Sequence, residues 1–126
     1  MKFTISKDDF KDLASLTPGE YAATIGKPTH DVKDGAEEGD PGYYRIPFII
    51  TETPDGVART ISEIFSCKEG AKFRWAALLK ALGMEPEAGS VDIDPEELEG
   101  GEVKVTVTHR TYEDRIFNSI KKFSKA

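Results

Sequence analysis

Tyrosine and arginine side chains stand close together in the middle of the chain, in a pattern that could bind an anionic polymer. Tyr43 and Arg45 are two residues apart, and Arg59 follows after a turn. A guanidinium pairs with phosphate, and a flat ring stacks on an unpaired base, each stack being worth about 1–3 kcal/mol. These residue types predict a surface that binds phosphates and bases. Its candidate nucleic-acid-binding residues are Tyr43, Arg45, Arg59, Lys104, Arg110, Tyr112 and Arg115.

Such a surface needs cations and flat side chains, and the candidates divide between these roles. The arginines and Lys104 are the expected cations, because each lies at a strand or turn position whose neighbours face the core. Tyr43 and Tyr112 are the expected stacking residues, with His109 and Phe65 as weaker candidates. Tyr43 could instead cover the end of a barrel, and Tyr112 could pack against a hairpin turn. Three further residues could extend the cationic path or form a solvated end: Lys121, Lys122 and Lys125.

Other chemistry has little support in the sequence. Cys67 and His109 could be written as a nucleophile and its base, but no third residue that would orient them is recognisable. The acidic residues 31–42 lack the regular ligand spacing of a calcium loop, and two histidines are too few for a metal cluster. We therefore predict no enzymatic activity, no metal and no cofactor.

The charge of the chain is unevenly distributed. The net charge of −6 at face value disfavours a nucleic-acid partner. Residues 85–102, however, include eight acidic residues and no Lys or Arg, whereas residues 103–126 include six basic residues and two acidic ones. A fold that places this basic segment beside Arg45 and Arg59 would show a positive stripe on an acidic molecule. The alternative is a set of ordinary solvated charges.

The segment Tyr43–Ser66 predicts a β-hairpin. Apolar residues recur with a period of two in both halves, and Pro54-Asp55-Gly56 between them supplies the φ angles of a tight reversal. One face of this hairpin must belong to the core. We expect Tyr43, Arg45 and Arg59 on the other face.

Further elements are expected on both sides of the hairpin. Residues 1–16 form an N-terminal arm with a short helix that begins near Ser6 and Asp9, and a strand of about seven residues around Ala23 follows. Residues 31–42 and 85–101 are acidic loops, of which we expect the first to be mobile.

A helix is predicted over residues 71–82. Four apolar residues share one of its faces, which makes the single tryptophan a core anchor rather than a stacking platform. Gly83 is placed to cap the end of this helix, and Asp94 is placed to begin a further helical turn at Pro95. The apolar residues of the shared face are Trp75, Leu78, Leu79 and Leu82.

Two more strands complete the chain. Residues 103–110 alternate inward valines with polar residues, and residues 111–114 have the composition of a turn. From Arg115 the period is ambiguous between strand and helix, and we expect a strand through about Ile120. Five strands with one helix between the third and fourth match a mainly β fold, the five-stranded Greek-key barrel called the OB-fold. Other small barrels and split sandwiches stay open as alternatives for this single domain of 126 residues.

Short motifs over residues 16–123 resemble, in their order and spacing, a family of small phage proteins. These motifs are Leu16-Thr17-Pro18-Gly19-Glu20-Tyr21, the alternating run Tyr44 to Ile50, the helix end Ala77 to Gly83, the run Leu98 to His109, and Tyr112 with Asn118 and Ile120. Members of that family are described as single-stranded-DNA-binding proteins with an OB-fold, and many of them are uncharacterised. The resemblance therefore implies the same fold and the same ligand here.

What the resemblance implies is a non-catalytic protein that coats single-stranded DNA in replication or recombination. The expected compartment is the cytoplasm, that of the host if a phage encodes the protein. Replication or recombination proteins are possible partners, RNA is an alternative ligand, and the protein is expected as a monomer or homodimer. The basic end Lys121–Ala126 departs from the acidic tail by which many single-strand binders recruit partners, which argues against recruitment of that kind.

A protein–protein interaction module is the main alternative, in which a β-hairpin edge binds a phage structural or regulatory partner. The outer face of the hairpin separates the two hypotheses. An apolar patch there favours a protein partner, and a groove of Tyr and Arg favours a nucleic acid. The chain has no apolar run of the length that spans a membrane, so no membrane association is expected.

Overall fold

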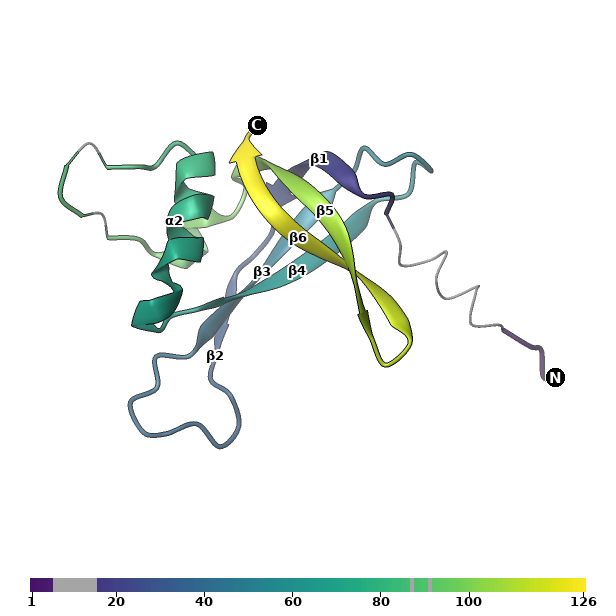
Figure 1. Ribbon diagram of the computed structural model, residues 1–126, viewed down its shortest axis with the longest axis horizontal. Helices are drawn as coiled ribbons and strands as arrows, with labels where there is room; N and C mark the ends of the chain where they lie inside the picture. Colours follow the sequence, from purple (N-terminus) through teal and green to yellow (C-terminus); the bar gives the residue numbers. More distant parts are fainter. Residues whose placement is uncertain (6–15, 87, 91) are drawn as a thin grey trace.

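The computed structural model describes residues 1–5, 16–86, 88–90 and 92–126, apart from the side chain of Arg115. Over these residues the chain forms one antiparallel sheet of six strands, one α-helix and two short 3-10 helices, which confirms the mainly β class (Figure 1). No described helix is long and apolar enough to cross a membrane. The elements in chain order are β1 Gly19–Ile25, β2 Thr29–Asp31, β3 Tyr43–Ile50, β4 Arg59–Ser66, η1 Glu69–Ala71, α2 Lys72–Ala81, η2 Pro95–Leu98, β5 Glu102–Tyr112 and β6 Arg115–Lys125.

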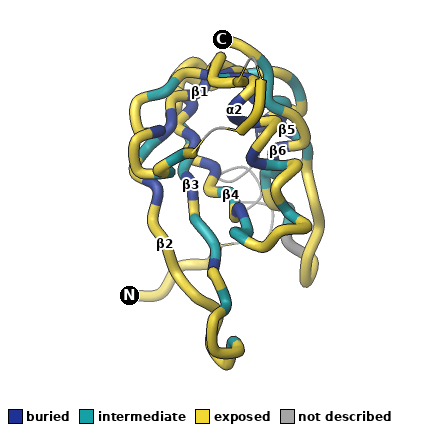
Figure 2. Tube along the Cα trace, turned by 90° about the vertical axis from the view of Figure 1, so that its left-hand side faces the viewer, coloured by how far each residue is buried: buried dark blue, intermediate teal, exposed yellow. Residues whose placement is uncertain are grey.

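The sheet follows the predicted hairpins but does not close into a barrel. Strand β3 pairs with β4 along one edge and with both β1 and β2 along the other. Strand β1 also pairs with β5, and β5 pairs with β6. In the described part of the chain no ladder joins β4 to β6, so the barrel is not closed and the predicted OB-fold is not confirmed. Buried and exposed positions alternate along β3, because one face of the sheet covers the core (Figure 2).

Two side chains and one backbone N–H, from three elements, bridge the gap between β4 and β6. Glu63 of β4 accepts a hydrogen bond from the backbone N–H of Ile120 through Oε1 (2.7 Å) and one from Arg74 of α2 through Oε2 (3.1 Å). Arg74 also donates to the carbonyl of Ile64 (2.7 Å), and its guanidinium lies over the ring of Phe65. We call Glu63, Arg74 and Ile120 the clasp. It holds α2 and β6 against the edge of β4 in place of a ladder.

Helix α2 packs on the core as its apolar spacing predicts. Trp75, Leu78 and Leu79 are buried, and the indole N–H of Trp75 donates to the carbonyl of Ser66 (2.9 Å). This arrangement confirms Trp75 as a core anchor. Gly83 ends the helix with a φ of 75°, a conformation that glycine adopts without a steric cost.

Strand β2 is a sixth strand that the sequence pattern did not predict. It runs from Thr29 to Asp31 along the edge of β3, so Asp31 belongs to a strand and not to the acidic loop. Just before it the chain passes close to Pro47, where a Cβ on Gly26 would lie 2.8 Å from the proline ring. The N–H of Gly26 donates to the carbonyl of Pro47 (2.8 Å). These contacts join residues distant in sequence, so no local pattern could indicate the pairing.

Strand β6 continues past Ile120 to Lys125, further than predicted. Its ladder with β5 is shifted by one residue, and Lys121 is the extra residue of a β-bulge. The bulge reverses the alternation of side chains, so Ile120 is buried and Phe123 also packs against the core. The mixture of strand and helix periods in this segment is a consequence of the bulge.

The three remaining local predictions have different outcomes. The short helix expected near Ser6 and Asp9 lies outside the described residues. Leu16, assigned to the N-terminal arm, is a core residue: it is 2% exposed, and its N–H donates to Oδ1 of Asn118 (2.9 Å). Asp94 caps η2 with its side chain, as predicted.

Candidate nucleic-acid interface

Tyr43 and Arg45 lie together on the outer face of the β3–β4 hairpin, as the alternation indicates. Arg45 is exposed and stands opposite Ile64 of β4 and Thr29 of β2. Tyr43 is half-buried and stands opposite Ser66. Among the described residues no carboxylate pairs with the guanidinium of Arg45, so its charge is available to an anion.

Apolar side chains share this face with the tyrosine and the arginine. Ile64 is 47% exposed and Ile49 is 36% exposed. The outer face of the hairpin therefore combines the feature expected of a protein-binding surface with the one expected of a nucleic-acid-binding surface.

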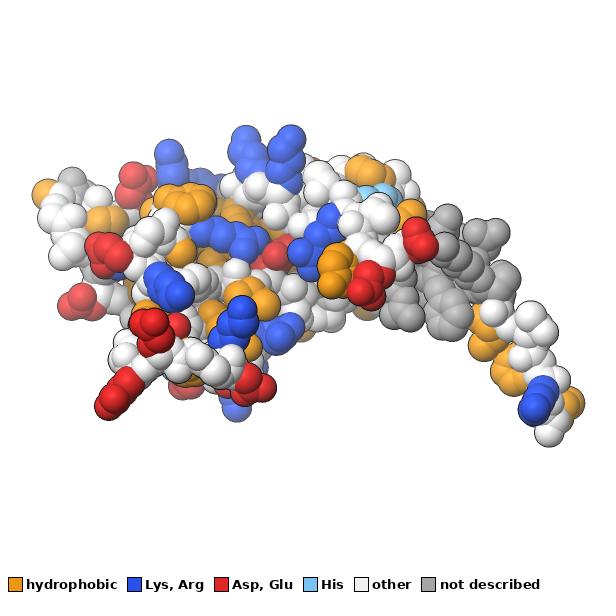
Figure 3. Space-filling view, turned by 60° about the horizontal axis from the view of Figure 1, so that its bottom comes forward, with side chains coloured by type: hydrophobic (Ala, Val, Ile, Leu, Met, Phe, Trp, Pro, Cys, Tyr) orange, Lys and Arg blue, Asp and Glu red, His pale blue; other side chains and the backbone are white. Residues whose placement is uncertain are grey.

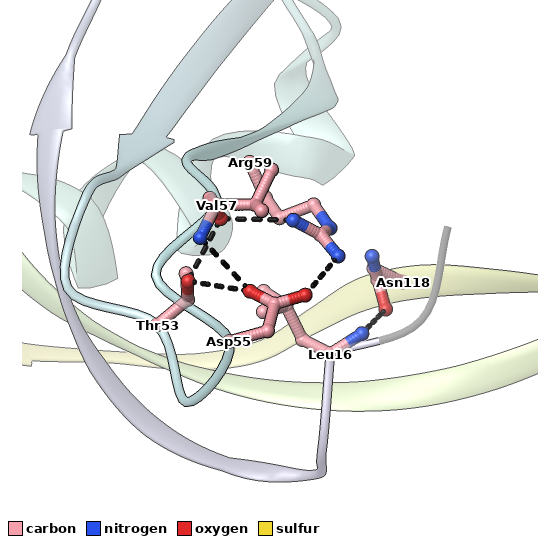
Figure 4. A network of polar contacts seen from close by, with 6 residues as sticks. All are labelled: Leu16, Thr53, Asp55, Val57, Arg59 and Asn118. Carbon is pink, nitrogen blue, oxygen red and sulfur yellow. Dashed lines mark hydrogen bonds and ion pairs between the residues drawn. The ribbon is translucent and has the colours of Figure 1, made fainter. Parts of the chain in front are cut away.

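Arg59 lies on the opposite face of the hairpin from Arg45, which corrects its expected placement. It stands opposite the buried Ile50, so the register of the hairpin turns its side chain toward the core. The side chain is 12% exposed, and its guanidinium donates to the carbonyl of Val57 (2.8 Å) and to Asp55 (2.7 Å) (Figure 4). Arg59 is therefore held within the fold and offers little to a phosphate.

The loop before β4 is organised around the carboxylate of Asp55. It accepts hydrogen bonds from the N–H of Val57 (3.0 Å), the hydroxyl of Thr53 (2.9 Å) and the guanidinium of Arg59. These bonds, the one from Val57 above all, favour the ionised form and lower the pKa of Asp55 to about 2. We call this loop, with Arg59, the Asp55 clamp.

Arg110 and Tyr112 lie on the outer face of the β5–β6 hairpin, where it projects beyond the core (Figure 1). The guanidinium carbon of Arg110 lies 6.0 Å from the ring centroid of Phe117, its partner on β6. Tyr112 is 66% exposed and Phe117 is 38% exposed. One cation and two accessible rings thus share a face. We call Arg110, Tyr112 and Phe117 the ribbon cluster.

The other predicted cations of this hairpin contribute less. Lys104 is exposed at the far end of β5, with its Nζ 3.8 Å from a carboxylate oxygen of Glu20. Arg115 begins β6, and its side chain lies outside the described part of the structure. Glu113 and Asp114 form the turn at the tip of the hairpin, with φ angles of 49° and 63°.

The two weaker stacking candidates, Phe65 and His109, both lie on the inner side of their strands. Phe65 has no exposed surface and belongs to the core, so it is not available for stacking. Nε2 of His109 lies 2.5 Å from the carbonyl oxygen of Leu16, on the inner side of the hairpin. Phe117 was missed. Its outward direction follows from a strand period after Arg115, and the ambiguous period of that segment concealed it.

The outer face of the β3–β4 hairpin, with Tyr43, Arg45, Ile49 and Ile64, is called the hairpin face. It is a separate surface from the ribbon cluster. Strand β1 lies between β3 and β5 in the sheet, and Arg59 faces inward. The single positive stripe expected from Arg45 and Arg59 to the C-terminal basic segment is therefore not formed on the sheet.

Neither the remaining chemistry nor comparison with known proteins assigns a function. Burial, and to a lesser extent Asp40, raises the pKa of the Cys67 thiol, which disfavours the nucleophilic thiolate. The described residues contain no group of three or more His, Cys, Asp and Glu side chains that could hold a metal ion. No protein-family model and no curated protein matches the chain. The geometry of the surfaces is therefore the basis for a functional proposal.

Proposed function

We propose that this protein binds single-stranded DNA without catalysis, by phosphate pairing and base stacking. The ribbon cluster carries the proposal, because the guanidinium of Arg110 and the rings of Tyr112 and Phe117 share one accessible face. A cation neutralises the backbone and each ring accepts a base of any sequence. A protein of this kind coats single strands during replication or recombination.

A single strand fits the ribbon cluster better than a duplex does. Bases in a duplex are already paired and stacked, so a duplex offers phosphates but no free base to the rings of Tyr112 and Phe117. Neither ring contact depends on the sugar, so binding of RNA is one outcome of the tests below.

The topology supports the finer proposal of an OB-fold. Strand β1 pairs with both β3 and β5, and α2 lies in chain order between β4 and β5. An OB-fold is a partly open Greek-key barrel of five strands. We infer that β1 and β2 act as one strand bent near Gly26, and that the clasp substitutes for the last ladder of the barrel.

The test is fluorescence anisotropy of a labelled oligothymidine of about 30 nucleotides beside a duplex of equal length, at about 50 and 200 mM salt. We expect tighter binding of the single strand, with an affinity that falls as salt rises. The double variant Tyr112→Ala/Phe117→Ala should weaken binding at least about tenfold, since each stack is worth about 1–3 kcal/mol. Phe3→Ala is the matched control, because Phe3 is an exposed aromatic residue outside the ribbon cluster. The absence of binding at micromolar protein and low salt would overturn the proposal.

Exposed Ile49 and Ile64 on the hairpin face favour a second candidate, a protein-interaction module. The protein-interaction module replaces single-stranded-DNA binding as the proposed function if the wild-type protein does not bind oligothymidine and Ile64→Asp changes its sedimentation. It is excluded as the main function if oligothymidine binds and Ile64→Asp alters neither binding nor sedimentation.

A further inference from the structure

Helix α2 and the C-terminal half of β6 enclose a groove of about 550 Å3. We call it the basic groove, because five cations line it and, among the described residues, no carboxylate does. In the space-filling view, Lys and Arg side chains lie across the middle of the face and along its upper edge, and acidic side chains are most numerous toward the left and lower left (Figure 3). The cations of the groove are Arg74, Lys80, Lys121, Lys122 and Lys125.

The four lysines of the groove are available to an anion, whereas its arginine is not. Arg74 is held by Glu63 and by the carbonyl of Ile64. In the described part of the chain none of these four lysines forms an ion pair, and the lysines that do are others. Lys80 reaches the groove from α2 and the other three reach it from β6. An extended anion between the two walls therefore meets positive charge on both sides.

The β-bulge explains how consecutive lysines reach the same groove. In a regular strand, Lys121 and Lys122 would point to opposite faces of the sheet. Because Lys121 is the extra residue of the bulge, the alternation is interrupted there, and both residues line the groove. The irregularity concentrates charge on one wall.

Phe73 gives the basic groove an exposed flat ring. It is 76% exposed, and the residues that follow it on the same side of the helix are the small Ala77 and Ala81. A protein partner binds best by anchoring a bulky side chain in a well-packed pocket. The other apolar residues of the groove are Ala77, the buried Ala81 and Phe123, so the surface beside the ring is small or already packed against the core. An unpaired base requires only the face of the ring. The groove therefore fits a nucleic acid better than an acidic peptide.

We propose that the basic groove binds the sugar–phosphate backbone of a single-stranded nucleic acid, with a base stacked on Phe73. This inference rests on the proposed function and adds a second contact segment for the same strand. Strand β6 connects the two surfaces, since Phe117 and Lys121 are about 13 Å apart along an extended strand. A single-stranded nucleic acid of several nucleotides therefore reaches from the ribbon cluster into the groove.

The experiment compares two groove variants with wild type, Lys121→Glu/Lys122→Glu and Phe73→Ala, in oligothymidine titrations over several salt concentrations. Each lost phosphate contact lowers the slope of log affinity against log salt by about 0.7 for a single strand, so the double variant should lose about 1.4. Phe73→Ala should weaken binding about tenfold with an unchanged slope. The matched control is Lys2→Glu/Lys33→Glu, which changes the net charge equally at two exposed lysines outside both surfaces. Thermal unfolding of each variant verifies that it is folded.

The outcomes separate this inference from the proposed function. If oligothymidine binds wild type and the ribbon variants weaken it, but the groove variants match the control, the groove inference is overturned and the proposed function stands. If the groove variants weaken binding and the ribbon variants do not, the groove inference is supported and the ribbon assignment fails. A labelled polyglutamate peptide is the second probe. Should wild type bind that peptide, and not oligothymidine, with Lys121→Glu/Lys122→Glu abolishing the interaction, the groove holds an acidic protein segment and the nucleic-acid assignment is overturned.

Discussion

Two sets of cations in this molecule differ in what their charges contact. The guanidinium groups of Arg59 and Arg74 are held by carboxylates and carbonyls of the fold itself. Arg45, Arg110 and the groove lysines have no carboxylate partner within 4.0 Å among the described residues. The comparison teaches that the density of basic residues in a sequence does not locate a binding surface. The partners of each cation decide whether its charge is available to a ligand.

The difference has a physical cause in the alternation of β4. Arg59 and Glu63 occupy core-facing positions of this strand, where a charge that loses water must gain a partner. Arg45 and Arg110 occupy outward positions, where water solvates them without such a partner. The same residue type is thus structural on one face of the sheet and available to a ligand on the other.

Removing the partner of a held cation should give the largest effect. Glu63→Ala leaves the Ile120 N–H without its acceptor and the Arg74 guanidinium without its carboxylate partner, and we expect the free energy of unfolding to fall by about 2–3 kcal/mol. Urea denaturation measures it. Glu63→Gln keeps an acceptor for the N–H and should lose less. Glu69→Ala, which breaks an exposed pair with Lys72, should stay within about 0.5 kcal/mol of wild type, and an equal loss in both variants would contradict the role of the clasp.

Exchanging one arginine from each set tests the comparison directly. Arg59→Gln breaks hydrogen bonds inside the fold, so it should lower the free energy of unfolding by about 1 kcal/mol and leave the salt dependence of oligothymidine binding unchanged. Arg110→Gln should keep the stability and reduce the salt slope by about 0.7, the share of one phosphate contact. Denaturation and anisotropy on the same preparations provide both readouts. The comparison breaks down if Arg59→Gln reduces the slope and Arg110→Gln does not.

The smallest expected effect is a pH dependence from the Asp55 clamp. The pKa of Asp55 is about 2 in the folded protein, below its ordinary value of 3.8, so folding favours the ionised form. Its stabilising contribution is complete above about pH 4 and is lost as the pH falls through 2. Asp55→Asn should therefore differ most from wild type above pH 4 and converge with it near pH 2. Urea midpoints of both proteins between pH 2 and 5 measure the difference, and a gap that stays constant over this range would refute the assignment.

The sequence by itself determined the elements whose signals are local. The hairpin around Pro54-Asp55-Gly56, the helix with Trp75 inside and the cap at Asp94 all follow from periodicity and turn chemistry. These signals are reliable because burial of one face imposes a period of 2 or 3.6 on nearby residues. The outward direction of Arg45 and Arg110 was accessible for the same reason.

Only the tertiary structure decided which cations are held and where the basic groove lies. Arg59 was assigned to the wrong face because that face depends on the hairpin register, and the groove unites a helix with a strand about forty residues later. Phe73 and Lys80 gave no signal, since the apolar face of α2 points away from them toward the core. The pairing of β2, the bulge at Lys121 and the clasp all join distant segments. Such contacts depend on how the elements pack against one another, and local periodicity contains no record of that packing.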